Sequence, residues 1–295
     1  MRAPGASVGM VGLLLVWGGC RGAAPPPPTP RMSVQELTTP VAPGSGEPSL
    51  TATSDGRLLL SWLGPAGESR HALRYASRTK GGSWSAVRTV AEGTDWFVNW
   101  ADFPSIAALP DGTLFAHWLA RSGQGTYAYD VRIAISRDGG QSWGESVVPH
   151  RDGTRTEHGF VSLAPWAPEQ MGIVWLDGRK TANAKPPEHG HSQAEMSLMH
   201  TMVGRDGRLD AETLLDGRVC DCCQTDSARA GAATVVAYRD RTDQEVRDVS
   251  VVRFADGRWS EPRPLARDGW QINGCPVNGP AIAASSNHVA VAWFT

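Results

Sequence analysis

Short runs of alternating apolar and polar residues, separated by turn residues, dominate this chain. Val131, Ile133 and Ile135 alternate with smaller or charged residues, which is the period of a strand with one buried face. This run leads into Ser136–Trp143 (SRDGGQSW), in which Asp138 can accept hydrogen bonds from the turn and the paired glycines tolerate positive φ. The pattern therefore predicts a β-hairpin turn at residues 136–143.

A second copy of this turn lies upstream at Ser77–Trp84 (SRTKGGSW), where Thr79 replaces the aspartate. The shared positions are a leading serine, a central glycine and a closing tryptophan. They are Ser136, Asp138, Gly140 and Trp143 in one copy and Ser77, Gly81 and Trp84 in the other. We interpret both copies as structural elements that stabilise hairpins.

A longer repeat surrounds these turns. A short strand of small residues, followed by a more apolar strand, recurs at intervals of 53 to 65 residues. The first strands begin near residues 48, 104, 161, 226 and 279, and the second strands cover 58–62, 114–119, 172–176, 235–238 and 289–293. Four strands per repeat at this spacing are typical of a propeller blade. We predict an all-β propeller of four-stranded antiparallel blades with the first strand of each blade innermost.

The repeat also predicts where loops gather. Because strand direction alternates, the loops leading into the first strands share one face with the loops joining second to third strands. We call this the mouth face. The hairpins at Ser77–Trp84 and Ser136–Trp143 lie on the opposite face. The fifth repeat stops at Thr295 within its second strand, so we expect the chain to lack its C-terminal blades.

Composition fits one large β domain and excludes some partners. The 295 residues are 41% hydrophobic, include 33 glycines and 21 prolines, and carry a formal net charge of -2. The many glycines and prolines suit short strands and turns. Basic residues do not outnumber acidic ones, so the composition does not indicate a protein that binds nucleic acid.

The N-terminus predicts export. Residues 1–20 carry one early charge, an apolar core at 8–17 and Gly-Gly before Cys20, which is the layout of a secretory signal. The end of this segment resembles a bacterial lipobox, which implies that Cys20 is lipidated and anchors the chain to a membrane, periplasmic or at the cell surface. Residues 21–46 form a proline-rich linker before the propeller at 47–295. An ordinary signal peptide with a trailing tail is the alternative, and it also implies export.

The cysteines mark a candidate site. Cys220, Cys222 and Cys223 precede the first strand of the fourth repeat, and Cys275 precedes that of the fifth. We expect the four sulfurs to meet at the mouth. Disulfides suit an exported chain, a thiolate site for Cu or Zn is the second interpretation, and a redox role is the third. The copper interpretation also draws on His189 and His191 in a neighbouring loop.

Other polar residues fall at equivalent places on the mouth face. The predicted ligand-contacting residues are Asp102, His158, Asp177, Arg239 and Asp240. The catalytic candidates are Asp102, Arg179, Arg239 and Arg247, since arginines can recognise an anion and a carboxylate can act as an acid or base.

The repeat and its SxDxGxxW hairpins resemble the sialidase-like, Asp-box (BNR) β-propeller superfamily, over roughly residues 47–295. Its sialidases are six-bladed, bind the substrate carboxylate with three arginines and use a tyrosine nucleophile with an aspartate acid/base. One arginine belongs to a Phe/Tyr-Arg-Ile-Pro motif, and here the matching stretch places Glu47 where the arginine would stand. We therefore expect a sialidase-like propeller whose Cys-rich mouth binds a carbohydrate, another small ligand or a metal, without orthodox sialidase chemistry. An exo-sialidase is the alternative.

Overall fold

The computed structural model describes residues 33–183, 195–272 and 274–295. The chain divides into two compact units, Met1–Thr38 and Thr39–Thr295. Residues 33–38 of the first unit have no regular secondary structure. The predicted signal segment with Cys20 lies outside the described residues, as do His189 and His191. No helix among the described residues is long and apolar enough to cross a bilayer.

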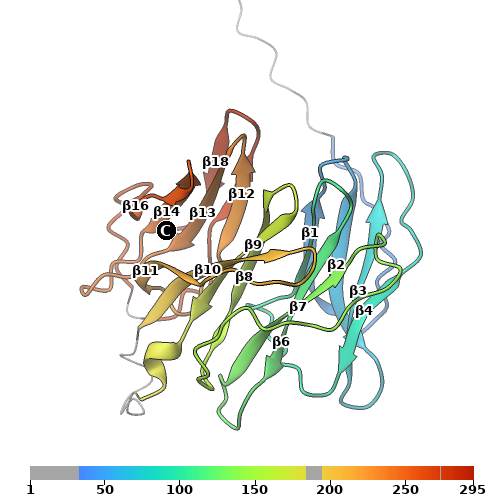
Figure 1. Ribbon diagram of the computed structural model, residues 1–295, viewed down its shortest axis with the longest axis horizontal. Coiled ribbons are helices and arrows are strands. Elements are labelled where there is room, and N and C mark those ends of the chain that lie inside the picture. Colours follow the sequence, from blue (N-terminus) through green and yellow to red (C-terminus); the bar gives the residue numbers. More distant parts are fainter. Residues whose placement is uncertain (1–32, 184–194, 273) are drawn as a thin grey trace, which may run out of the picture. The chain divides into compact units, whose positions relative to one another are not determined.

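The second unit consists of five antiparallel sheets (Figure 1). The first contains β1 (Gly46–Ala52), β2 (Leu58–Pro65), β3 (His71–Arg78) and β4 (Arg88–Gly93). The second contains β5 (Ser105–Ala108), β6 (Leu114–Arg121) and β7 (Tyr129–Ser136). The third contains β8 (His158–Ala167), β9 (Gln170–Asp177), β10 (Met196–Gly204) and β11 (Thr213–Val219). The fourth contains β12 (Asp226–Ala230), β13 (Ala233–Arg239), β14 (Val249–Ala255), β15 (Arg258–Trp259) and β16 (Arg263–Pro264). The fifth pairs β17 (Ala281–Ala284) with β18 (Val289–Ala292), and a 3-10 turn, η1 (Arg179–Thr181), follows β9.

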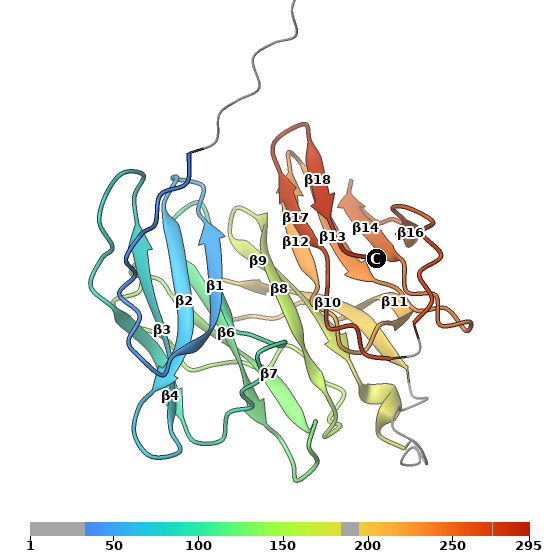
Figure 2. The ribbon, with the colours of Figure 1, turned by 180° about the vertical axis from the view of Figure 1, so that it is seen from behind.

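The first strands of successive sheets lie side by side. Contacts join β1 to β5, β5 to β8, β8 to β12 and β12 to β17, and Figure 2 shows the last pair clearly. These strands surround a channel of about 460 Å³ that Ser49, Ser105, Ser162, Asp226 and Pro280 help to line. The innermost position of the first strands is thus confirmed, and the all-β propeller prediction is correct.

Apolar side chains fill the spaces between neighbouring sheets. Leu59, Leu73 and Tyr75 of the first sheet pack with Leu114 and Trp118 of the second. Equivalent clusters join the second sheet to the third and the third to the fourth. Face-to-face packing of this kind needs apolar side chains on both faces of an inner sheet, which explains why β6 is buried along nearly its whole length.

The second sheet departs from the predicted four strands. It has three regular strands, and only an isolated bridge between Val147 and Ile133 stands in the place of a fourth. Pro149 follows closely, and proline cannot donate a hydrogen bond to a sheet ladder. After Val147 the chain bends away from the second sheet, and His150 therefore lies against the third sheet.

The Ser136–Trp143 turn is held by the side chain of Asp138. Its Oδ1 accepts hydrogen bonds from Ser136 Oγ (2.8 Å) and from the backbone N–H groups of Gln141 (2.9 Å) and Ser142 (3.0 Å). Trp143 then packs edge-on against Tyr75 of the first sheet, with ring centroids 6.2 Å apart. Both this turn and the one at Ser77–Trp84 follow the third strand of their sheets, β7 and β3.

Candidate functional site

A cavity of about 430 Å³ opens on the mouth face. Its walls come from the loops leading into β5, β8, β12 and β17 and from the loop between β6 and β7. We call it the mouth cavity. Its chemically distinctive residues are the aromatic Phe97, Trp100, Tyr127, Tyr129 and Phe160, the acidic Asp102, Glu157 and Asp221, and the disulfide-bonded Cys222 and Cys275.

Two carboxyl groups share one phenol in this cavity. The hydroxyl of Tyr129 lies 2.9 Å from Oδ2 of Asp102 and 2.8 Å from Oε1 of Glu157. A phenol has one hydrogen, so both contacts are hydrogen bonds only if one carboxyl is protonated and donates to the phenol oxygen. The arrangement therefore holds a proton on the carboxyl pair.

Burial explains why this proton stays at neutral pH. Desolvation raises the pKa of Asp102 to about 7, although the N–H of Phe160 and the Tyr129 hydroxyl favour its charged form. Desolvation also raises the pKa of Glu157 to about 8. Burial and the two neighbouring carboxyls raise the pKa of Tyr129 well above its usual value. The phenol therefore stays neutral, and it lacks the activation that a tyrosine nucleophile requires.

Backbone geometry at the start of β8 positions Asp102. Phe160 has φ of 53° and donates its N–H to Asp102 Oδ1 at 2.7 Å. The preceding residue is Gly159, where a Cβ atom would lie 2.0 Å from Asp102 Oδ2. Only glycine leaves room for the carboxylate here, and a non-glycine residue with positive φ next to it is typical of a functional site.

Aromatic rings form the rim of the mouth cavity. The side chains of Trp100 and Tyr127 are 72% and 58% exposed, unusual values for such large rings. Deeper in the wall, Phe97 stacks on Tyr129 with centroids 4.0 Å apart. Exposed rings above buried carboxyls combine an apolar platform with a few directed polar groups, as ligand sites commonly do.

We expect the stability contribution of Asp102 to depend on pH. Its pKa is raised on folding, so the stabilisation is complete below about pH 4 and is lost as pH rises to about 7. Asn cannot titrate, so the free energy of unfolding of the wild type relative to Asp102→Asn should fall by about 4 kcal/mol from pH 4 to pH 8. Urea denaturation of both proteins across this range measures the difference, and a constant difference would contradict the assignment.

Four cysteines lie close together, two as a disulfide and two as thiols. A disulfide joins Cys222 to Cys275, whose Cα atoms are 6.0 Å apart, while Cys220 and Cys223 are buried thiols with sulfurs 3.1 Å apart. The hydrogen bond from Cys223 is the main cause that lowers the pKa of Cys220 to about 7, with help from Arg247. With two sulfurs in a disulfide, only two thiols of this group remain to bind a metal.

The three arginine candidates do not line the mouth cavity. Arg239 is 1% exposed and donates to the carbonyls of Asn278 (3.0 Å), Arg247 (2.6 Å) and Phe294 (2.7 Å). The guanidinium of Arg247 pairs with Glu245 (2.8 Å) and Asp221 (3.2 Å). Arg179 pairs with Asp177 and Glu212, each at 2.7 Å. Asp240 accepts from Ser250 Oγ at 3.2 Å outside the cavity.

We expect Arg239→Ala to destabilise the chain rather than to remove an anion clamp. The change leaves one buried and two part-buried carbonyls without their donor and removes the stacking on Trp270, 4.5 Å away. The free energy of unfolding should fall by about 3 kcal/mol. Urea denaturation measures this, and Arg239→Lys should recover little because lysine lacks the planar fork. A loss below about 0.5 kcal/mol would contradict this role.

His158 and Asp177 lie in a separate cluster behind the mouth cavity. The His158 ring is fully buried and stacks on His150 with centroids 3.7 Å apart. Asp130, Asp152 and Asp177 surround the two rings. The sequence pattern did not single out His150, Asp130 or Asp152, because they fall on a bent segment and at a strand start without equivalents in other repeats.

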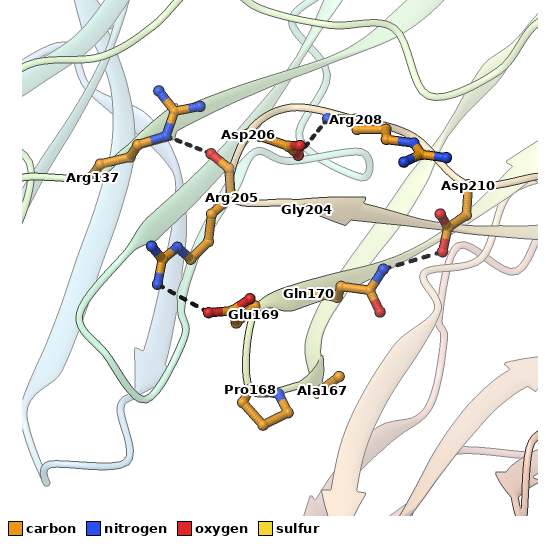
Figure 3. A pocket seen from close by; sticks show the side chains of 10 residues that line it. All are labelled: Arg137, Ala167, Pro168, Glu169, Gln170, Gly204, Arg205, Asp206, Arg208 and Asp210. Carbon is orange, nitrogen blue, oxygen red and sulfur yellow. Dashed lines mark hydrogen bonds and ion pairs between the residues drawn. The ribbon is translucent and has the colours of Figure 1, made fainter.

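A larger hollow, about 940 Å³, lies among the turns (Figure 3). It is an open groove between the β8–β9 and β10–β11 turns, with Arg137 of the Ser136–Trp143 turn at its edge. Its charged groups bind one another: Arg205 pairs with Glu169 at 3.5 Å, and Gln170 donates to Asp210 at 3.2 Å. These contacts use part of its polar groups, and we place the candidate site in the mouth cavity because the carboxyl pair lies there.

Comparison with known proteins supports the fold. No known protein family matches the chain, and no curated protein is similar in sequence. A protein of unknown function from Dyadobacter fermentans matches with a TM-score of 0.54 and 12% identity, over 81% of this chain and 72% of that one. An α-L-arabinofuranosidase from Fusarium graminearum matches at 0.50 and 14%, over 85% and 75%. An ulvan lyase bound to -[GlcA(1-4)Rha3S]- matches at 0.50 and 11%, over 88% and 68%. At these identities the likeness extends to the β-propeller fold alone.

Proposed function

We propose that the chain is a glycan-active propeller that binds a neutral sugar in the mouth cavity and cleaves its glycosidic bond by acid catalysis. The proposal rests on one observation above all: Asp102 and Glu157 share the Tyr129 hydroxyl, at 2.9 and 2.8 Å, beneath exposed aromatic rings. Because both carboxyls contact one phenol oxygen, their bonded oxygens lie at most about 5.7 Å apart, and glycosidases use a pair of carboxyls at the scissile bond.

The two carboxyls take different roles in this proposal. Glu157 is the more exposed, so it donates the proton to the leaving glycosidic oxygen as the C–O bond breaks. Asp102 has the lower pKa of the pair, about 7 against about 8, and accepts a 2.7 Å hydrogen bond from Phe160, so it is the carboxylate that stabilises positive charge developing on the sugar ring. Water then forms the new C–O bond to the sugar carbon and returns a proton to the Glu157 carboxylate, which restores the starting state. Trp100 and Tyr127 offer ring faces to the apolar side of the sugar.

The charge of the mouth cavity argues for a neutral sugar. Asp102, Glu157 and Asp221 line it, and no arginine or lysine is among its described lining residues. A sialoside carboxylate would meet acidic groups without a cationic fork. Glu47, which replaces the expected arginine, is not among the lining residues either. The neutral phenol of Tyr129 is a further argument against exo-sialidase, the alternative function.

A substrate panel tests the proposal. We expect the full chain to bind or hydrolyse at least one neutral oligosaccharide and to leave a fluorogenic sialoside intact. Trp100→Ala should weaken glycan binding about tenfold, a loss of roughly 1.4 kcal/mol. Leu214→Ala, which removes an apolar side chain exposed on β11, is the matched control. Sialoside hydrolysis, or equal loss in both variants, would overturn the proposal.

We propose further that the protein is exported and anchored through lipidated Cys20. The Cys222–Cys275 disulfide supports an oxidising compartment, since cytosolic proteins rarely keep structural disulfides. Palmitate labelling of cells that express the full chain tests the anchor. Label should be present on the wild type and absent from Cys20→Ser.

A further inference from the structure

We propose that the cluster behind the mouth cavity is a binding site for a divalent transition-metal ion. Asp152, His158 and Asp177 supply the core ligands, and His150 and Asp130 complete the surroundings. This site is separate from the cysteine group, and the inference does not depend on the proposed glycan activity.

Interatomic distances fit a metal of the zinc class. Metal–nitrogen and metal–oxygen bonds of about 2.0–2.2 Å separate neighbouring ligand atoms of a tetrahedral site by about 3.4 Å. Here Nε2 of His158 lies 3.2 Å from Oδ1 of Asp152 and 3.7 Å from Oδ2 of Asp177. Nδ1 of His150 lies 3.3 Å from the same Asp152 oxygen. The ligand atoms are thus already near the spacing that the ion requires.

The second nitrogen of His158 favours ligation. Nδ1 lies 3.2 Å from the carbonyl oxygen of Thr156, so it carries the hydrogen and leaves a lone pair on Nε2. A backbone carbonyl that orients the ring in this way is the usual partner of a metal-bound histidine. In this tautomer a lone pair faces two carboxylate oxygens, and a cation between them would relieve the repulsion.

Unpartnered buried atoms supply the second argument. Within the described residues, Nε2 of His158, Nε2 of His150, Oδ1 of Asp152 and Oδ1 of Asp130 are buried and have no hydrogen-bond partner. The side chains of His158, His150 and Asp152 are 0%, 4% and 6% exposed. Buried polar atoms without partners are rare in proteins, and a missing ion is one physical reason for them.

Charge and access also suit a cation. Three aspartates surround the two histidines, and the nearest described cation, Arg179, binds Asp177 and Glu212 at 2.7 Å and lies 3.9 Å from Oδ1 of Asp152. Asp130 and His150 also line a surface hollow of about 450 Å³, which provides a route for the ion. Mixed imidazole and carboxylate ligands suit zinc and its first-row neighbours better than calcium or copper(I).

The site would join two sheets. Asp130 lies in β7, His150 and Asp152 follow the second sheet, and His158 and Asp177 lie in β8 and β9. Tyr129 and Glu157 directly precede Asp130 and His158. An ion here would therefore fix the backbone beside the carboxyl pair without touching the mouth cavity.

Zinc binding to the chelator-stripped full chain tests the proposal. Equilibrium dialysis with elemental analysis should give about one zinc per chain. Asp152→Asn and His158→Gln should weaken binding at least tenfold, as loss of a ligand does. His71→Gln, at a histidine of the first sheet, and Cys220→Ser should bind as the wild type does. Absence of zinc from the wild type, unchanged binding in both cluster variants, or loss of binding in Cys220→Ser would overturn the proposal.

Cobalt spectroscopy of the wild type tests the location of the metal site even if the cluster variants do not fold. A Co²⁺ ion bound by nitrogen and oxygen gives weak d–d bands only, and this is the expected result. An intense thiolate-to-cobalt charge-transfer band would place the ion on the cysteines and contradict the site.

Discussion

We expect Glu157→Gln to lower kcat on the cleaved neutral glycan by about 100- to 10,000-fold, the range for loss of a general acid. Gln keeps the size of the side chain and its contact with Tyr129, but it has no proton to donate to the leaving oxygen. Binding should change little, because the aromatic platform is untouched. Steady-state kinetics together with calorimetric titration of the glycan separate the two effects.

Glu92→Gln is the matched control for this change. Glu92 is an exposed glutamate of β4 in the first sheet, outside the mouth cavity. The Glu92→Gln variant should retain the full wild-type activity. If Glu157→Gln keeps more than a tenth of the wild-type kcat, or if Glu92→Gln loses activity equally, Glu157 is not the acid.

We expect Cys275→Ser to cause the largest loss of stability. The disulfide with Cys222 spans 53 residues of sequence, and closing a loop of this length removes about 4 kcal/mol of unfolded-state entropy. For a domain of this size the midpoint of thermal unfolding should fall by about 10 °C. Scanning calorimetry measures this fall.

Reductant provides the control for the disulfide. It should lower the midpoint of the wild type by a similar amount and leave Cys275→Ser unaffected. An unchanged midpoint in the variant, or an effect of reductant that persists in it, would show that the bond does not stabilise the fold.

The sequence predicted the fold well because propeller blades repeat. First strands predicted near residues 48, 104, 161, 226 and 279 correspond to β1, β5, β8, β12 and β17, since each carries the same local pattern. Two sheets depart from the predicted four strands: in the fourth sheet, β15 and β16 both pair with β14 in place of one strand, and the second sheet lacks a regular fourth strand. In the second sheet, Pro149 and the path of the chain toward His150 end the pairing after the single bridge at Val147.

The candidate site could be predicted only in part. Asp102 and the cysteine pair Cys222 and Cys275 line the mouth cavity, as loops at equivalent places predict. Tyr129 and Glu157 were not singled out, because their shared hydrogen bonds depend on how two sheets meet and not on local spacing. Arg239, predicted to contact a ligand, is 1% exposed and donates to three backbone carbonyls outside the mouth cavity, contacts between distant segments that local spacing does not reveal.

The most direct test of the glycan site is a crystal structure of Glu157→Gln with the neutral oligosaccharide that the wild type cleaves. We expect sugar density in the mouth cavity, against Trp100 and Tyr127, with the scissile oxygen within hydrogen-bond reach of the amide that replaces the Glu157 carboxyl. Density instead in the groove beside Arg205, or in the channel between the first strands, would contradict it.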